Sequence, residues 1–287
     1  MIRLESSALR VAVATRGAEL QSLRSLADGH EHLWQAGPEW PRHAPWLFPA
    51  ICRVPEDRIE VAGRSWPMPG HGFARDLDFR VDELDARSAV LSLHDSPRTH
   101  RHYPCRFSLS IRYELVGTAV LVHLTAANRD RRSMPFSLGF HPAFAWPLDT
   151  APGPHAIAFE RPEVAPTRRV TDNLLREELF EPAAPNGSLA LDRAHFADGA
   201  VILEQAASRG IRYESPSGRA VEMDWTGFDA LAIWSPPDGD LLCVEPWRGL
   251  PARIGASSDF ASRPDLTTLA PGEAAEFTVR IRLHPAR

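Results

Sequence analysis

Hydrophobic and polar residues alternate with a period of two in short stretches along the whole chain. Successive side chains of a β-strand point to opposite faces, so this alternation predicts strands with one buried face. Turn-forming stretches such as ADG, LVG, SPSG and PPDG separate these segments. The predicted strands are residues 9–15, 58–63, 89–94, 107–115, 120–126 and 277–283.

Strands that follow one another without intervening helices predict an all-β fold, a large antiparallel β-sandwich, and not a parallel sheet covered by helices. The 26 prolines and 18 glycines leave few places for a long helix. Only residues 171–180, TDNLLREELF, have a helical pattern. We expect the Pro- and Ala-rich residues 150–168 to form a surface connection, and residues 1–287 to form a single domain, because no composition shift marks a linker.

The formal net charge of −5 is spread over segments of mixed sign, so neither nucleic acid nor an anionic membrane is an expected partner. Arg3 and Glu5 precede any apolar run, and no segment is apolar over the length that spans a bilayer. The three cysteines show no CxxC spacing, which fits reduced thiols. These features predict a cytoplasmic protein that binds a small molecule, and they do not predict an oligomeric state.

The chain contains no lysine, so all 32 of its Lys and Arg residues are arginines. This excludes Schiff-base catalysis, anchoring of pyridoxal phosphate and the P-loop lysine. GxSxG and GxGxxG motifs are also absent. The remaining titratable side chains favour proton transfer as the chemistry of any active site.

Four segments break the alternation and combine aromatic with polar residues. A histidine stands among aromatic residues in FSLGFHPAFAWP, and CVEPWRGLPA places Glu245 after a predicted buried strand, FDALAIW. A carboxylate in that position must be solvated in a cleft, paired, or shifted in pKa. The tryptophans of the first segment either line a site or close the end of the sandwich. The four segments are residues 34–54, 70–79, 136–147 and 243–252.

The ordered set of motifs APWLFP, HGFAR, GFHPAF and CVEPW resembles the aldose 1-epimerase (galactose mutarotase-like) family, especially its LacX-like branch. The likeness runs from LWQ at 33–35 to EPW at 245–247. It implies a cofactor-independent, metal-free isomerase that interconverts the α and β anomers of an aldohexose or related sugar. Such an enzyme removes the proton of the anomeric hydroxyl, protonates the ring oxygen and so opens the ring.

The resemblance implies that His141 is the general acid and Glu245 the general base. His71 would bind sugar hydroxyls, and Arg53 would also contact the sugar. Histidine suits proton donation near neutral pH because its unperturbed pKa is about 6.5.

Trp247 follows the Glu-Pro pair where many galactose mutarotases have glutamine, and Cys52 precedes Arg53 where they have asparagine. The tryptophan would stack on the apolar face of a pyranose. For a phosphorylated sugar, Arg75 and the loop HDSPRTHRH at 94–102 are the first candidates to hold the phosphate.

Structural alternatives remain open for several of these residues. Glu245 could form a buried ion pair with Arg248, and Arg53 could pair with Glu56 or Asp57. The His-Glu-His triplet at 30–32 has metal-ligand residue types, although exposed loop positions are the usual place for such triplets.

Three other functions remain open beside the mutarotase. The first is a non-catalytic carbohydrate-binding or sugar-sensing protein, and the second is a hexose-6-phosphate mutarotase. The third is a glycoside hydrolase or lyase, which would need a second acid near Glu245. Asp224 and Asp229 are the nearest candidates in sequence.

Overall fold

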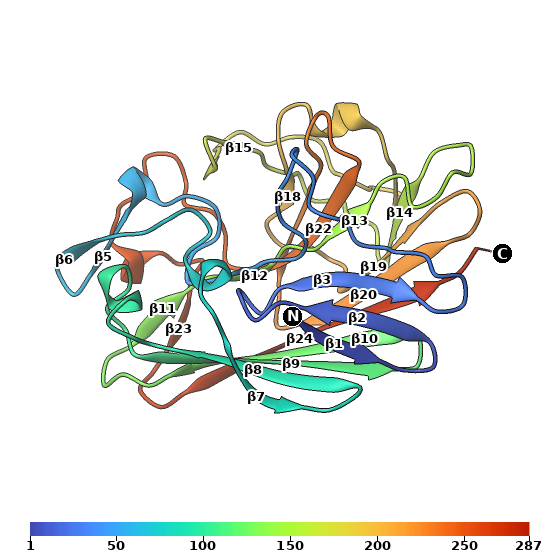
Figure 1. Cartoon of the computed structure of the whole chain (residues 1–287). Helices are drawn as coiled ribbons and strands as arrows, with labels where there is room; N and C mark the ends of the chain where they lie inside the picture. Colours follow the sequence, from blue (N-terminus) through green and yellow to red (C-terminus); the bar gives the residue numbers. More distant parts are fainter. Residues whose placement is uncertain (287) are drawn as a thin grey trace.

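The computed structural model describes residues 1–286, which consist almost entirely of antiparallel strands (Figure 1). The expected all-β antiparallel sandwich is therefore confirmed. Long strands of one sheet run along the lower part of Figure 1, and the strands of a second sheet lie above them.

The larger sheet has nine strands. Along β20, Val221 and Met223 are buried while Glu222 and Asp224 are partly exposed, because successive side chains of a strand point to opposite faces. In spatial order the strands are β17 (Ser188–Ala190), β14 (Ala156–Phe159), β19 (Gly210–Glu214), β20 (Ala220–Thr226), β24 (Ala274–His284), β10 (Ala119–Asn128), β9 (Phe107–Val116), β8 (Ser88–His94) and β7 (Arg80–Leu84).

The second sheet has six strands and packs on the first. Trp46 Nε1 of this sheet donates to the Tyr113 hydroxyl of β9 at 2.9 Å, and one apolar cluster contains side chains of both sheets. Its strands are β18 (Val201–Leu203), β21 (Ala230–Trp234), β22 (Leu241–Arg248), β12 (Leu138–Phe140) and β4 (Trp46–Leu47), and β13 (Ala143–Ala145) also pairs with β22.

Smaller sheets and short helices complete residues 1–286. None of the helices there has the length and apolar character that a membrane crossing requires. The small sheets are β1 (Ile2–Glu5), β2 (Leu9–Val13) and β3 (Leu20–Ser25); β5 (Arg58–Val61) and β6 (Arg64–Pro67); β11 (Met134–Phe136) and β23 (Thr267–Leu269); β15 (Val170–Thr171) and β16 (Leu174–Leu175). The 3₁₀ helices are η1 (Pro55–Asp57), η2 (Ala74–Asp76), η3 (Thr99–Arg101), η4 (Arg193–Phe196) and η5 (Phe260–Ser262).

Each of the six strands predicted from alternation is present as β2, β5, β8, β9, β10 or β24. The predicted helix at 171–180 is wrong, because β15 and β16 form a hairpin there. Asp172 and Asn173 make its turn with φ of 51° and 62°. These two residue types tolerate the left-handed region, so they favour a tight turn over a helix.

The expectation of a surface connection over 150–168 is wrong in part. Residues 156–159 form β14, where Ile157 and Phe159 are buried in the core. The alternation covers only the four residues of β14, and prolines lie on both sides of it, so the sequence pattern did not indicate a strand.

The two faces of β22 have different surroundings. Leu242 and Val244 belong to the core between the two sheets, whereas Cys243, Glu245 and Trp247 alternate with them and point to the opposite face. The sequence suggested that Glu245 follows a buried strand. It lies instead inside β22, a central strand of the six-stranded sheet.

Candidate active site

A cavity of about 380 Å³ lies over this second face of the six-stranded sheet. Its size is within the range of about 300–1,000 Å³ that is typical of small-ligand sites. All four segments that break the strand alternation contribute to its lining, with Trp40, Cys52, His71, His141 and Glu245. Segments distant in sequence thus converge on one concave site.

His141 and Glu245 contact each other in the cavity lining, with 3.3 Å between Nε2 and Oε2. Glu245 is fixed by its place in β22, and the backbone N–H of His141 donates to the Pro45 carbonyl at 3.0 Å. Trp247 Nε1 donates to the same Oε2 at 3.2 Å, and the Trp40 ring stacks on the imidazole. The carboxyl and imidazole are therefore held as a dyad.

Burial changes where the dyad keeps its proton. Desolvation raises the pKa of Glu245 well above its ordinary value, although the Trp247 hydrogen bond opposes this. Desolvation, aided by the charge of Arg75, lowers the pKa of His141 to about 3. A neutral carboxyl beside a neutral imidazole is the arrangement that both shifts favour.

His71 lies next to the dyad, with its ring centroid 5.8 Å from that of His141. Its Nδ1 accepts the backbone N–H of Cys52 at 3.2 Å, so the ring proton is on Nε2. Burial and the charge of Arg75 lower its pKa well below the ordinary value. His71 is thus a neutral ring whose Nε2–H is available to a ligand oxygen.

Gly72 follows His71 in the chain and has no room for a side chain. Its φ is +68°, and a Cβ there would lie 2.0 Å from the Phe48 carbonyl oxygen.

Gly72→Ala is therefore expected to lower the free energy of unfolding by about 3 kcal/mol or more, as measured by urea denaturation. Gly117→Ala is the matched control: its φ is +59° but nothing lies within 4 Å, so about 1 kcal/mol of strain is expected. Equal losses in the two variants would contradict this prediction.

Trp247 lines the cavity, as the predicted sugar contact should, but Arg53 does not. The Arg53 guanidinium forms two hydrogen bonds to Asp57, at 2.7 and 2.6 Å, which is one of the ion pairs considered from sequence. The alternative pair of Glu245 with Arg248 is wrong, because Arg248 contacts Asp229 at 2.8 Å.

Arg75 is not part of the lining either. Its Nη2 donates to the Gly70 carbonyl at 2.8 Å, which supports the turn that carries His71. The 94–102 loop is also separate from the cavity: His100 contacts Asp95 at 3.0 Å, and His102 Nδ1 lies 2.8 Å from the Pro67 carbonyl oxygen. The structure therefore does not assemble the phosphate site that was considered for these residues.

Several lining residues were not identified from the sequence. Asp172 and Asn173 reach the cavity from the β15–β16 hairpin, and Trp234 reaches it from β21. The adjacent Asp and Asn between apolar residues are a turn signal that could have revealed the hairpin. Among the three N-terminal tryptophans, Trp40 lines the cavity and Trp46 belongs to the core.

Within residues 1–286 we consider two groups of side chains of the types that bind metals, the first of which is the triplet at 30–32. In the His-Glu-His triplet, Glu31 is turned to Ser22 and to the backbone N–H groups of Leu23 and Leu33, away from any shared centre with the histidines.

The second group is His141, Cys243 and Glu245, whose ligand atoms lie within 4.8 Å of one another. These are residue types that bind zinc, with bonds of about 2.0–2.3 Å. Two ligand atoms that are 4.8 Å apart cannot both reach one zinc ion over bonds of that length, so the side chains would have to move closer together to bind it.

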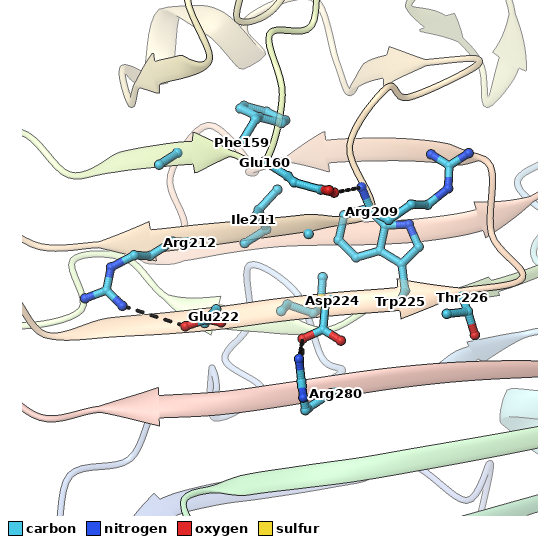
Figure 2. Close-up of a pocket in the computed structure, with 13 residues that line it drawn as sticks. Phe159, Glu160, Arg209, Ile211, Arg212, Glu222, Asp224, Trp225, Thr226 and Arg280 are labelled. Atoms are coloured by element: carbon cyan, nitrogen blue, oxygen red, sulfur yellow. Dashed lines mark hydrogen bonds and ion pairs between the residues drawn. The ribbon is translucent and has the colours of Figure 1, made fainter.

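A larger hollow of about 540 Å³ lies on the outer face of the nine-stranded sheet (Figure 2). Its charged side chains neutralise one another: Arg280 contacts Asp224 at 2.7 Å, and Arg212 lies 4.0 Å from Glu222. Because it lacks buried, convergent polar groups, we assign the candidate active site to the cavity that contains the dyad.

A family model described as Aldose 1-epimerase matches residues 1–282. The chain belongs to the aldose 1-epimerase family. It is 30% identical over 288 residues to the chromosomal protein LacX of Lactococcus lactis subsp. lactis. That alignment covers 94% of this chain and 95% of LacX. The expected family is therefore confirmed.

Solved structures show the same fold. A galactose mutarotase-like protein from Lactobacillus casei ATCC 334 superposes with a TM-score of 0.92 at 31% identity, covering 99% of this chain and 100% of that chain. A galactose mutarotase related enzyme from Lactobacillus acidophilus has a TM-score of 0.90 at 28% identity, covering 99% and 97%. Family and fold together support a mutarotase-type function.

Proposed function

We propose that this protein interconverts the α and β anomers of a free aldose, using His141 and Glu245 to move protons. The observation that carries the proposal is the contact between their side chains in a cavity of the size of a sugar site. The neutral forms favoured by burial provide one acid and one base side by side.

Ring opening and ring closure use the dyad in opposite directions. In opening, His141 Nε2 takes the proton of the anomeric hydroxyl while the Glu245 carboxyl gives its proton to the ring oxygen; the C1–O5 bond breaks and C1=O1 forms. The C1–C2 bond then rotates. In closure, the C5 hydroxyl attacks C1 and gives its proton to the Glu245 carboxylate, and the imidazolium protonates O1.

This cycle returns each proton to its starting atom, so no cofactor is consumed. Family resemblance implies the opposite roles in opening, with Glu245 as the base and His141 as the acid. We reverse them because burial favours the neutral carboxyl and the neutral imidazole. The Nε2–H of His71 would donate to a sugar oxygen, and Trp40, Trp234 and Trp247 provide aromatic surface for the apolar face of the ring.

Exchange between anomers tests the proposal against a protein that only binds or senses sugar. Freshly dissolved α-glucose and α-galactose should reach anomeric equilibrium faster with catalytic amounts of the protein, in polarimetry and in NMR exchange between the anomers. Binding of these sugars without faster exchange would reject the enzyme. A glycoside hydrolase would need a second acid near Glu245, but neither Asp224 nor Asp229 lines the cavity.

Metal ions provide a separate prediction. Proton transfer alone opens the ring, so exchange should persist in excess EDTA. Added Zn²⁺ should inhibit, because it would take the lone pairs of His141 and Glu245 with Cys243 as third ligand, and Cys243→Ala should weaken this inhibition. Anomer exchange followed by NMR measures both effects. Loss of activity in EDTA that Zn²⁺ restores would instead make this group a catalytic metal site.

A further inference from the structure

A further cavity, of about 320 Å³, lies at the edge of the sandwich, and we call it the end cavity. Leu189 of β17, the edge strand of the nine-stranded sheet, lines it together with Val201 of β18, the edge strand of the six-stranded sheet. Residues 180–183 of the chain between these strands complete its apolar part. Its volume is within the range of small-ligand sites.

The end cavity is separate from the active cavity, because β18 lies between them. Ala200 and Ile202 line the active cavity, whereas Val201 lines the end cavity. Arg169 and Val170 are divided in the same way, with Arg169 in the end cavity. Successive side chains of an extended chain point to opposite faces, so the two cavities lie on opposite faces of this wall.

Arg169 brings a partly desolvated positive charge to the end cavity. Its Nη1 donates to the Thr167 hydroxyl at 3.3 Å and to the Arg168 carbonyl at 3.1 Å. Its Nε is shielded from water and has no hydrogen-bond acceptor, and burial lowers the pKa of Arg169 from its ordinary value. An anion in the cavity would stabilise a cation in this position.

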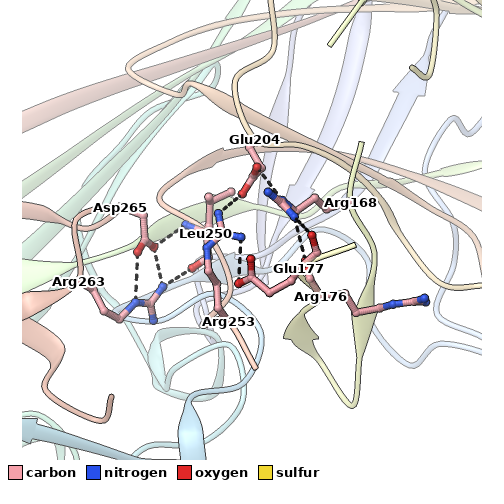
Figure 3. A network of polar contacts seen from close by, with 8 residues as sticks. All are labelled: Arg168, Arg176, Glu177, Glu204, Leu250, Arg253, Arg263 and Asp265. Carbon is pink, nitrogen blue, oxygen red and sulfur yellow. Dashed lines mark hydrogen bonds and ion pairs between the residues drawn. The ribbon is translucent and has the colours of Figure 1, made fainter. Parts of the chain in front are cut away.

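The arginines near it in the chain are already neutralised. Arg168 lies 2.8 Å from Glu204 (Figure 3), and Arg176 lies 2.6 Å from Asp198. Among residues 1–286, no carboxylate forms an ion pair with Arg169. The charge that faces the end cavity is therefore the one that remains available to a ligand.

A second donor lies in the same lining. His195 Nδ1 accepts the backbone N–H of Asp192 at 3.3 Å, so the ring proton is on Nε2. Glu181 also lines the cavity, but its side chain is exposed and is not among the charges that act on Arg169. A cation and a neutral donor beside apolar side chains suit an anion that carries an apolar group.

We propose that the end cavity binds a small carboxylate with an apolar body. The carboxylate contacts Arg169, and the apolar body lies among the side chains contributed by β17, β18 and residues 180–183. This site goes beyond the proposed mutarotase, since it lies outside the active cavity and needs no turnover.

Benzoate is the probe, and calorimetry measures its binding. For a ligand of this size we expect a Kd on the order of 1 mM. Benzamide has nearly the same shape without the charge and should bind at least about tenfold more weakly. Inorganic phosphate, which has no apolar body, should also bind more weakly than benzoate. The proposal is overturned if benzamide or phosphate binds as well as benzoate, or if benzoate does not bind up to about 10 mM.

Arg169→Gln keeps hydrogen-bond donors but removes the charge, so it should weaken benzoate binding about tenfold and change benzamide binding less than about twofold. Arg176→Gln is the matched control. Both guanidinium groups lie over the Phe180 ring, at 4.9 and 5.0 Å, but Arg176 does not line the end cavity. Its variant should keep the benzoate affinity within about twofold. Equal losses in the two variants would overturn the proposal.

Glu245→Gln shows which cavity holds the probe. This change in the active cavity should leave benzoate binding unaltered, because β18 separates the two cavities. Binding that is lost in Glu245→Gln and kept in Arg169→Gln would place benzoate in the active cavity and overturn the proposal. Calorimetry needs no anomer exchange, so failure of the mutarotase would leave this result readable.

Discussion

Glu245→Gln is expected to lower kcat for anomer exchange by about 10²–10⁴-fold. Glutamine has nearly the same size and can still accept from Trp247 Nε1, but it cannot give up and recover a proton at neutral pH. Because burial favours the neutral carboxyl, replacing it with a neutral amide should leave folding and sugar binding largely intact. NMR exchange between anomers measures the rate, and calorimetry measures the binding.

Glu163→Gln is the matched control for this variant. Glu163 is also buried, and its carboxylate accepts the backbone N–H groups of Ala207 and Ser208 at 2.9 and 2.8 Å, outside the cavity. Its loss should affect stability and leave kcat of the folded protein unchanged. Near-normal exchange in folded Glu245→Gln would eliminate the dyad mechanism.

His141→Asn is expected to reduce kcat by a similar factor of about 10²–10⁴, because asparagine forms hydrogen bonds but does not exchange protons. His71→Asn should mainly raise KM, since His71 is a neutral donor whose left-handed backbone, with φ of 63°, asparagine tolerates. Steady-state rates from polarimetry separate the two effects. A reversed order would exchange the roles of the two histidines.

The pH profile reports which dyad member holds the proton. Activity requires one shared proton, so it falls at low pH when His141 also protonates and at high pH when Glu245 ionises. Burial moves the first limb toward pH 3 and the second well above the ordinary range of a carboxyl, which gives a broad plateau.

With ordinary pKa values, about 4.3 for Glu and 6.5 for His, the assignment would be reversed. The acidic limb would then report Glu245 and the alkaline limb His141. In His141→Asn the acidic limb of the remaining activity should vanish and the alkaline limb should persist. Loss of the alkaline limb instead would show that Glu245 is the resting base.

Six of the strands and part of the site could be read from local sequence. Period-two alternation identifies strands because one face of a sheet is buried, and it was correct wherever it extended over five or more residues. The motifs that place His71, His141, Glu245 and Trp247 break this alternation, and all four side chains line the cavity. Local pattern failed at 171–180, where the choice between helix and hairpin depends on partners elsewhere in the chain.

The sequence by itself determined the fold class, the family and the residue types available for proton transfer. Only the tertiary structure decided that Glu245 lies inside β22 on the face opposite the core, that Arg53 is bonded to Asp57, and that Asp172 faces the cavity. The physical reason is that hydrophobic periodicity depends on neighbours along the chain. By contrast, the partners of a charged side chain, and hence its pKa, depend on strands brought together from distant parts of it.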